Sequence, residues 1–143
     1  MDIQILENET KMQVIIKCQQ VDENIHRLKS HIELFDNKLQ AKMEGDYQFV
    51  DAMDVLYFES VDNRVFLYTE NAVMEVKQRL YELEDMLSKQ DFIRISKSQI
   101  ININKIKTLK PELNRTILAT MCNGEQLYIS RKYVKELRSL LAI

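Results

Sequence analysis

The hydrophobic pattern of the first 38 residues changes part-way along the segment. The stretches MDIQILEN (residues 1–8) and KMQVIIKC (residues 11–18) are short and rich in branched apolar residues, so they predict two strands. The apolar residues that follow recur at helical spacing: Val21, Ile25, Leu28, Ile32 and Phe35. The pattern therefore predicts a small β-β-α extension over residues 1–38.

A second pattern occupies residues 39–143. Runs of β-branched and aromatic residues, such as DVLYFES, RVFLYTE and AVMEV, alternate with short polar turns, and Asn123-Gly124 is typical of a hairpin. Two helices are expected, one carrying a leucine stripe over VKQRLYELEDMLS and one over RKYVKELRSLL, which Ser130 can cap. We therefore expect a mainly β domain of about eight to ten antiparallel strands with few helices.

Charge is distributed unevenly along the chain. The net charge of the whole chain is -2, but residues 92–143 hold ten Lys or Arg against three acidic residues. The preceding residues hold ten bases and nineteen acids. This split suggests a polyanion-binding half joined to an acidic half, but on charge alone it is explained equally well by surfaces of strands and helices that segregate charge without a function.

Enzymatic chemistry finds little support in the sequence. His26 and His31 are five residues apart on a predicted helix, which is the wrong spacing for a metal-binding pair, and two glycines cannot build a phosphate-binding loop. Cys18 and Cys122 lie in apolar segments without metal-ligand spacing, so we expect buried, reduced thiols. The sequence predicts no catalysis, cofactor, metal or small-molecule substrate, and the absence of a long apolar run or signal peptide predicts a cytoplasmic location.

Polar and basic residues gather in three clusters at predicted turns or element ends. The first cluster spans residues 60–64, and the others are formed by Arg94, Ser96, Lys97, Ser98 and Asn102, and by Ser130, Arg131, Lys132 and Lys135. Arg and Lys can neutralise phosphates, whereas Asn and Arg can also bind base edges.

Each cluster also has a purely structural interpretation. Asp62 and Asn63 are common turn formers, and Asn102 can close local hydrogen bonds with the backbone. Ser130 can act simply as a helix cap. Arg131 and Lys132 are harder to explain in this way, because cations at a helix N-terminus oppose the helix dipole.

Taken in order, the segments DVLYFES, VKQRLYELEDML, FIRISKSQIININKI and GEQLYISRKYVKEL resemble the LytTR DNA-binding domain of bacterial transcription regulators. The similarity covers roughly residues 40–143. It implies an elongated fold of about ten strands in stacked sheets, whose loops enter successive major grooves at direct repeats. Many members have His at the position of Ser96 and some have Asn at Lys97, so a phosphate contact from this loop is favoured over base readout.

The resemblance also bears on the domain organisation. Most familiar members carry a receiver domain of about 120 residues, and roughly 40 residues precede the sheet here. The chain therefore resembles the stand-alone LytTR regulators without a receiver, some of which are paired with a small inhibitory membrane protein. We expect residues 1–38 to serve dimerisation or binding of such an inhibitor, and residues 39–143 to bind DNA.

These observations predict a sequence-specific, double-stranded DNA-binding transcription regulator, active as a homodimer and without enzymatic activity. The expected base readers are Asn63, Arg64 and Arg131. The alternatives are a protein-interaction module, which would use the acidic extension with the aromatic residues of positions 57–68, and an RNA-binding protein, which lacks support from any RNA-recognition motif. The expected phosphate contacts are Arg94, Lys97, Lys132 and Lys135, with Ser96 in the same interface.

Overall fold

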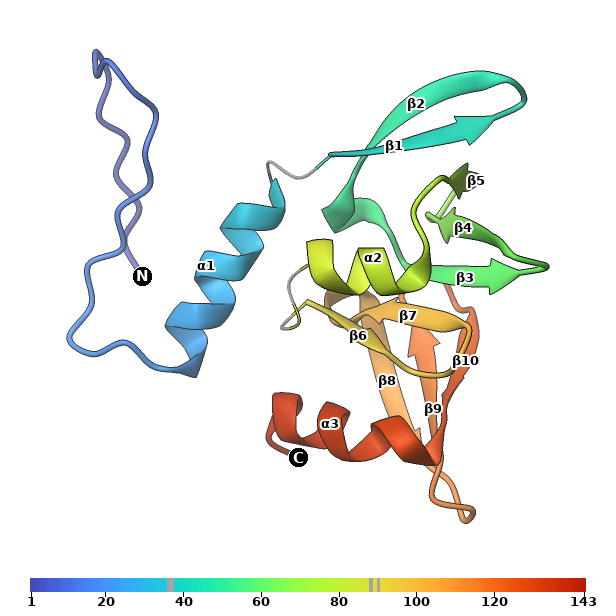
Figure 1. Cartoon of the computed structure of the whole chain (residues 1–143). Coiled ribbons are helices and arrows are strands. Elements are labelled where there is room, and N and C mark those ends of the chain that lie inside the picture. Colours follow the sequence, from blue (N-terminus) through green and yellow to red (C-terminus); the bar gives the residue numbers. More distant parts are fainter. Residues whose placement is uncertain (36–37, 88, 90) are drawn as a thin grey trace.

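The computed structural model describes residues 1–35, 38–87, 89 and 91–143, and within them it shows the mainly β fold that the sequence predicts. Ten strands and three α-helices follow one another with short connections (Figure 1). In chain order they are α1 (Glu23–Phe35), β1 (Lys38–Met43), β2 (Asp46–Asp51), β3 (Tyr57–Val61), β4 (Arg64–Tyr68), β5 (Val73–Val76), α2 (Leu80–Met86), β6 (Phe92–Arg94), β7 (Gln99–Asn102), β8 (Ile106–Pro111), β9 (Ile117–Met121), β10 (Gln126–Ile129) and α3 (Arg131–Leu141).

The strands form two antiparallel sheets. The larger sheet has seven strands in the order β2-β1-β5-β4-β3-β7-β6, and the smaller sheet has three in the order β10-β9-β8. Helix α2 covers one face of the larger sheet, and the smaller sheet with α3 lies on the other side (Figure 1). The larger sheet is therefore the middle layer of the molecule.

Alternation along the central strands builds two hydrophobic cores. Phe58 and Ile100 lie opposite each other on β3 and β7 and pack in the core beneath α2. Their chain neighbours Tyr57 and Ile101 point to the opposite face and join the core shared with the smaller sheet and α3. Successive side chains of a strand point to opposite faces, so residues 57–58 and 100–101 connect both cores through the same two strands.

The helices of the main domain bury the stripes that the sequence indicates. Leu80, Leu83 and Leu87 are buried under α2, and Leu137 of α3 is fully buried. The other apolar residues of α3 are partly buried around it: Tyr133, Val134, Leu140 and Leu141. The predicted hairpin at Asn123-Gly124 also forms, with Gly124 at φ 91° and the Asn123 side chain accepting a hydrogen bond from the Glu125 N–H at 3.1 Å.

The extension differs from the prediction. Its helix forms as α1, where the Asp22 carboxylate caps the helix by accepting a hydrogen bond from the Ile25 N–H at 3.0 Å. The two predicted strands do not form: residues 1–22 contain no strand or helix, and most of their large apolar side chains are exposed. A two-stranded hairpin alone is marginal in water, and these residues have no sheet or helix to pack against (Figure 1).

Helix α1 lies against the part of the molecule where β6 begins. Asp91, directly before β6, is almost fully buried, and it accepts a hydrogen bond from the Asn104 side chain at 2.7 Å. The Nδ1 atom of His31 on α1 lies 3.9 Å from the same carboxylate oxygen. These contacts place α1 beside the start of β6 and the end of β7.

Candidate nucleic-acid interface

The first polar cluster is the turn between β3 and β4. Asp62 and Asn63 both have positive φ, 51° and 62°, and Val61 pairs with Arg64 directly across the turn. This is the conformation of a two-residue hairpin turn, which Asn and Asp tolerate better than most other residues. The Nη1 group of Arg79 donates a hydrogen bond to the Asn63 carbonyl at 3.1 Å, and the turn therefore presents the exposed Asn63 side chain from a fixed backbone.

Arg64 follows this turn and already has a partner. Its guanidinium donates two hydrogen bonds to the Glu75 carboxylate, one of them from Nε at 3.2 Å, and it also lies over the Phe66 ring. The hydrogen bonds from Arg64 lower the pKa of Glu75, and both groups are exposed to solvent. An exposed pair of this kind is worth little, so Arg64 can exchange Glu75 for another anion at small cost.

The second cluster divides into a loop and a strand residue. In the loop between β6 and β7, the Ser96 hydroxyl accepts a hydrogen bond from the Ser98 N–H at 3.2 Å, so Ser96 stabilises the turn that exposes Lys97. Arg94 is placed differently: it is half-buried on β6, and its Nε lies 3.2 Å from the Glu84 carboxylate of α2. Arg94 therefore holds α2 against the sheet, a role that the sequence did not indicate for either residue.

Asn102 has the structural role that the sequence favoured. Its side chain is fully buried, donates to the Val55 carbonyl at 2.8 Å and accepts from the Asn104 N–H at 3.0 Å. A buried amide whose donor and acceptor are both satisfied locally has no group left for a ligand.

The third cluster begins α3. Ser130 occupies the N-cap position, but its hydroxyl does not cap the helix. It donates instead to the Ile95 carbonyl at 2.9 Å, and the Ser130 N–H donates to the same oxygen at 2.9 Å. Arg131 and Lys132 then project from the first turn of α3 and are exposed.

Backbone hydrogen bonds join the three clusters. The Ser60 N–H at the end of β3 donates to the Ser98 carbonyl at 2.8 Å, which ties the first turn to the β6–β7 loop. Ile95, at the other end of that loop, holds Ser130. The β3–β4 turn, the β6–β7 loop and the start of α3 consequently lie along one edge of the molecule, opposite α1 (Figure 1).

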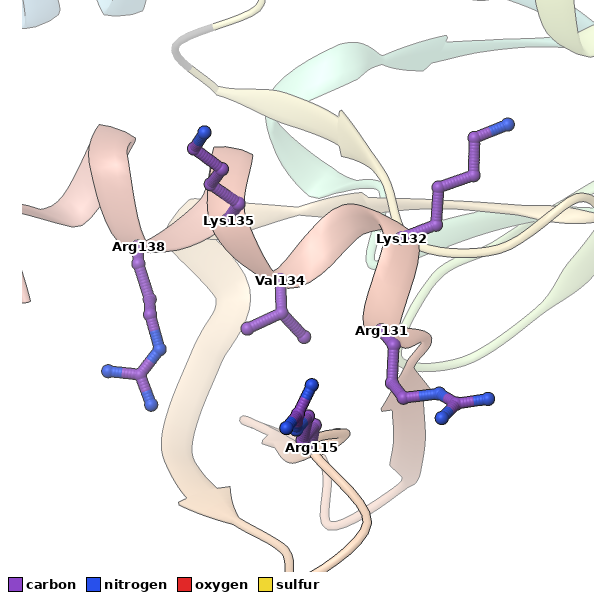
Figure 2. Close-up of a pocket in the computed structure, with 6 residues that line it drawn as sticks. All are labelled: Arg115, Arg131, Lys132, Val134, Lys135 and Arg138. Carbon is purple, nitrogen blue, oxygen red and sulfur yellow. The ribbon is translucent and has the colours of Figure 1, made fainter.

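A shallow groove of about 580 Å³ continues this edge along α3. Figure 2 shows Lys132 and Lys135 on one side of the helix, and Arg131 and Arg138 on the other side. Arg115 reaches the groove from the β8–β9 turn and faces Val134 (Figure 2). Sequence reasoning named neither Arg115 nor Arg138. Arg138 could have been found, because it lies seven residues after Arg131 on the same helix, whereas the position of Arg115 depends on a tertiary contact.

The cations of this edge differ in their partners. Among the described residues, Arg64 and Arg94 form ion pairs, whereas Lys97 and the five cations of the groove form none. A concentration of unpaired positive charge attracts polyanions, and two of these cations stand at a helix N-terminus, where the dipole opposes them. The arrangement is suited to a chain of phosphates.

Other kinds of site are not supported by the part of the chain that the structure describes. Its His, Cys, Asp and Glu residues form no group of three that could hold a metal ion. The burial predicted for Cys18 and Cys122 is wrong: both are free thiols and both are exposed, because Cys18 lies in the unpaired extension and Cys122 in a hairpin turn. No described helix has the length and apolar character needed to span a membrane.

Comparison with known proteins identifies the fold. The family model of the LytTr DNA-binding domain matches residues 45–142. The chain belongs to the LytTR family. A solved LytTr DNA-binding domain from Bacillus cereus superposes with a TM-score of 0.72 at 31% identity, covering 76% of this chain and 99% of that domain. The recognition of a LytTR-type fold from the sequence is thereby confirmed, and the family is one of DNA-binding domains rather than enzymes.

Relatives of the LytTR chain also match its extension. An uncharacterized HTH-type transcriptional regulator of Staphylococcus aureus (strain NCTC 8325 / PS 47) is 31% identical over 138 residues, which is 95% of this chain and 93% of that protein. The sensory transduction protein LytT of Bacillus subtilis (strain 168) is 29% identical over 96% of this chain and 57% of its own length. Both matches therefore include most of residues 1–38, outside the region of the family model.

Proposed function

We propose that this LytTR protein is a transcription regulator that binds double-stranded DNA sequence-specifically through the edge formed by the β3–β4 turn, the β6–β7 loop and the start of α3. The observation that carries the proposal is the hydrogen-bonded connection from Ser60 through Ser98 and Ile95 to Ser130. It fixes three polar loops relative to one another on a LytTR domain. Rigidly spaced loops are what reading successive stretches of a duplex requires.

The side chains divide into two roles. Asn63, Arg64 and Arg131 are the base readers, since Asn and Arg can form bidentate contacts with base edges, and Arg64 exchanges Glu75 for DNA on binding. The phosphate contacts are Lys97, Lys132 and Lys135, joined by Arg115 and Arg138 of the groove. Ser96 holds the β6–β7 loop, and Arg94 acts through the packing of α2 rather than on DNA.

The proposed mode of binding uses all three loops of the edge. The loops enter successive major grooves, and two copies occupy a direct repeat as a homodimer in the cytoplasm. Residues 1–38 provide the dimer contact or the binding site of an inhibitor, which would be a small membrane protein. Their position opposite the DNA-binding edge leaves both surfaces accessible at once (Figure 1).

Selection of bound duplexes from a random pool is the direct test of this function. An enriched motif is expected, and it should outcompete RNA of the same sequence. With about five phosphates neutralised, the logarithm of affinity for the selected duplex should fall with the logarithm of salt concentration at a slope of about -4.5. A pool without enrichment, or an affinity independent of salt, would contradict the proposal.

The groove residues give a second, quantitative test. Replacing Arg115 and Arg138 together by Gln should reduce the magnitude of the salt slope by about 2 and weaken all duplexes alike, because phosphate contacts carry no sequence information. Lys29→Gln with Lys42→Gln removes the same charge from α1 and β1, away from this edge, and should leave the slope nearly unchanged. Equal effects of the two double variants would mean that net charge alone, and not the groove, determines binding.

The alternative function, a protein-interaction module, would lack an aromatic docking surface at residues 57–58. Tyr57 and Phe58 are buried, and Tyr57 stacks on Tyr68 with 4.3 Å between the ring centroids, so these aromatic residues form core and not a docking surface. Burial and a hydrogen bond to Glu125 raise the pKa of Tyr57, as expected for an interior phenol. The extension remains as the candidate surface for a protein partner.

A further inference from the structure

Residues 1–22 expose more apolar surface than any comparable stretch of the described chain. Exposure of Ile3, Ile5 and Met12 exceeds 80%, and that of Val14 is 62%. Met1, Leu6, Ile15 and Val21 are exposed as well. Single apolar residues on a surface need no explanation, but eight large ones within 22 residues mark an interaction surface.

The order of these residues has the form of a hairpin. Asn8 has a φ of 69°, which is a turn conformation, and the chain bends at residues 8, 10 and 11. A turn of two or four residues here would pair odd-numbered residues of the first segment with even-numbered residues of the second. Met1, Ile3 and Ile5 would then share one face with Met12 and Val14. Gln4 and Gln13 would lie on the other face, together with Leu6 and Ile15.

A hairpin of this kind cannot bury its own apolar face. Two strands are marginal in water unless a third strand or another layer buries their apolar face, and both main cores are already closed by α2, α3 and the smaller sheet. Residues 1–21 have no hydrogen bond to the rest of the described chain. The cover must come from outside the chain.

The charged residues of the two segments indicate which partner binds this apolar face. The first segment carries Asp2, Glu7 and Glu9, whereas the second carries Lys11 and Lys17. In a twofold dimer each contact occurs twice, so the acidic segment of one copy can face the basic segment of the other in both directions. The five exposed apolar side chains of one hairpin face offer roughly 500 Å² on each copy, about the apolar share of a stable interface of ~800 Å² per partner.

We propose that residues 1–20 form a β-hairpin that pairs with the same hairpin of a second copy, and that this contact makes the regulator a dimer without DNA. This contact would be the dimer interface that the proposed function requires. Only its role at a direct repeat rests on that proposed function. Because the hairpin lies opposite the DNA-binding edge, two linked copies can hold adjacent half-sites, and affinity for the tandem site should exceed that for one half-site by about 10²-fold or more.

Sedimentation equilibrium of the full chain without DNA tests the dimer. We expect the wild-type protein to be a dimer. The double variant Ile5→Lys with Val14→Lys should have a dimer dissociation constant about 100-fold higher. Gln4→Lys with Gln13→Lys adds the same charge to the opposite face and should remain a dimer. All three proteins should have the same thermal stability, since these residues lie outside both cores, and should bind a single half-site equally.

Several results would overturn the inference. A wild-type protein that stays monomeric at all concentrations excludes the dimer, whether or not it binds DNA. A dimer that survives Ile5→Lys with Val14→Lys uses another surface, and equal dissociation of the Gln4 and Gln13 control would assign the effect to charge alone. Binding of the monomer to phosphatidylcholine vesicles through these residues would identify a membrane as the occupant. A hairpin dimer that enriches no duplex would leave this inference intact and refute the proposed function.

Discussion

Arg131→Ala is expected to cost about 1–3 kcal/mol of binding free energy on the selected duplex and to weaken sequence preference. Arg131 stands on the first turn of α3, is exposed, and forms no ion pair within the described residues. Its backbone is fixed by the two hydrogen bonds that Ser130 donates to the Ile95 carbonyl. A guanidinium held in this way can bind a base edge with two hydrogen bonds, which alanine cannot replace.

Lys132→Ala is the matched comparison for this prediction. Lys132 is the next residue of the helix and carries the same charge, but its side chain extends from the opposite side of the helix (Figure 2). It should weaken selected and scrambled duplexes alike and reduce the salt slope by about 1. Gel-shift titrations on both duplexes separate the two behaviours, and equal losses of specificity for Arg131→Ala and Lys132→Ala would refute the division of roles.

Leu137→Ala should destabilise the fold by about 2–5 kcal/mol, the range for removing a large side chain from a closed core. Leu137 is fully buried in the core between the larger sheet, the smaller sheet and α3. It is also the central contact that holds α3, and therefore Arg131 and Lys132, against the domain. Urea denaturation followed by circular dichroism measures the change, and specific DNA affinity should fall with it.

Leu113→Ala provides the control for this substitution. Leu113 lies in the β8–β9 turn and is fully exposed, so the same change of side chain should alter the free energy of unfolding by less than about 0.5 kcal/mol. If Leu137→Ala is as mild as Leu113→Ala, α3 is not held by the core in the way the structure indicates.

The main domain was predictable because its local signals agree with its packing. Leu80, Leu83 and Leu87 recur at helical spacing and all face the sheet, and Asn123-Gly124 directs a hairpin that then forms. The extension shows the opposite case. Its residues have strand-like composition, but strand pairing requires a partner with which to share hydrogen bonds, and a pattern within one segment does not reveal whether the same chain supplies that partner.

The candidate site was predictable in position but not in the pairing of its charges. All three clusters lie on one edge, because turns of a β domain can gather at the same end of its strands. The sequence could not show, however, that Arg94 meets Glu84 or that Arg64 meets Glu75. Those pairs join residues 10 or 11 positions apart on different elements. Ser130 illustrates the same limit, because its position indicated a cap while the hydroxyl binds Ile95, 35 residues earlier.

The double hydrogen bond between Ser130 and Ile95 also affects how new operator preferences could arise. Since one carbonyl of the β6–β7 loop sets the angle at which α3 leaves the sheet, exchanging that loop between relatives would tilt the helix as well. Chimaeras that graft a single loop should therefore lose recognition rather than acquire the donor's, and transplanting specificity would require both segments to move as one unit.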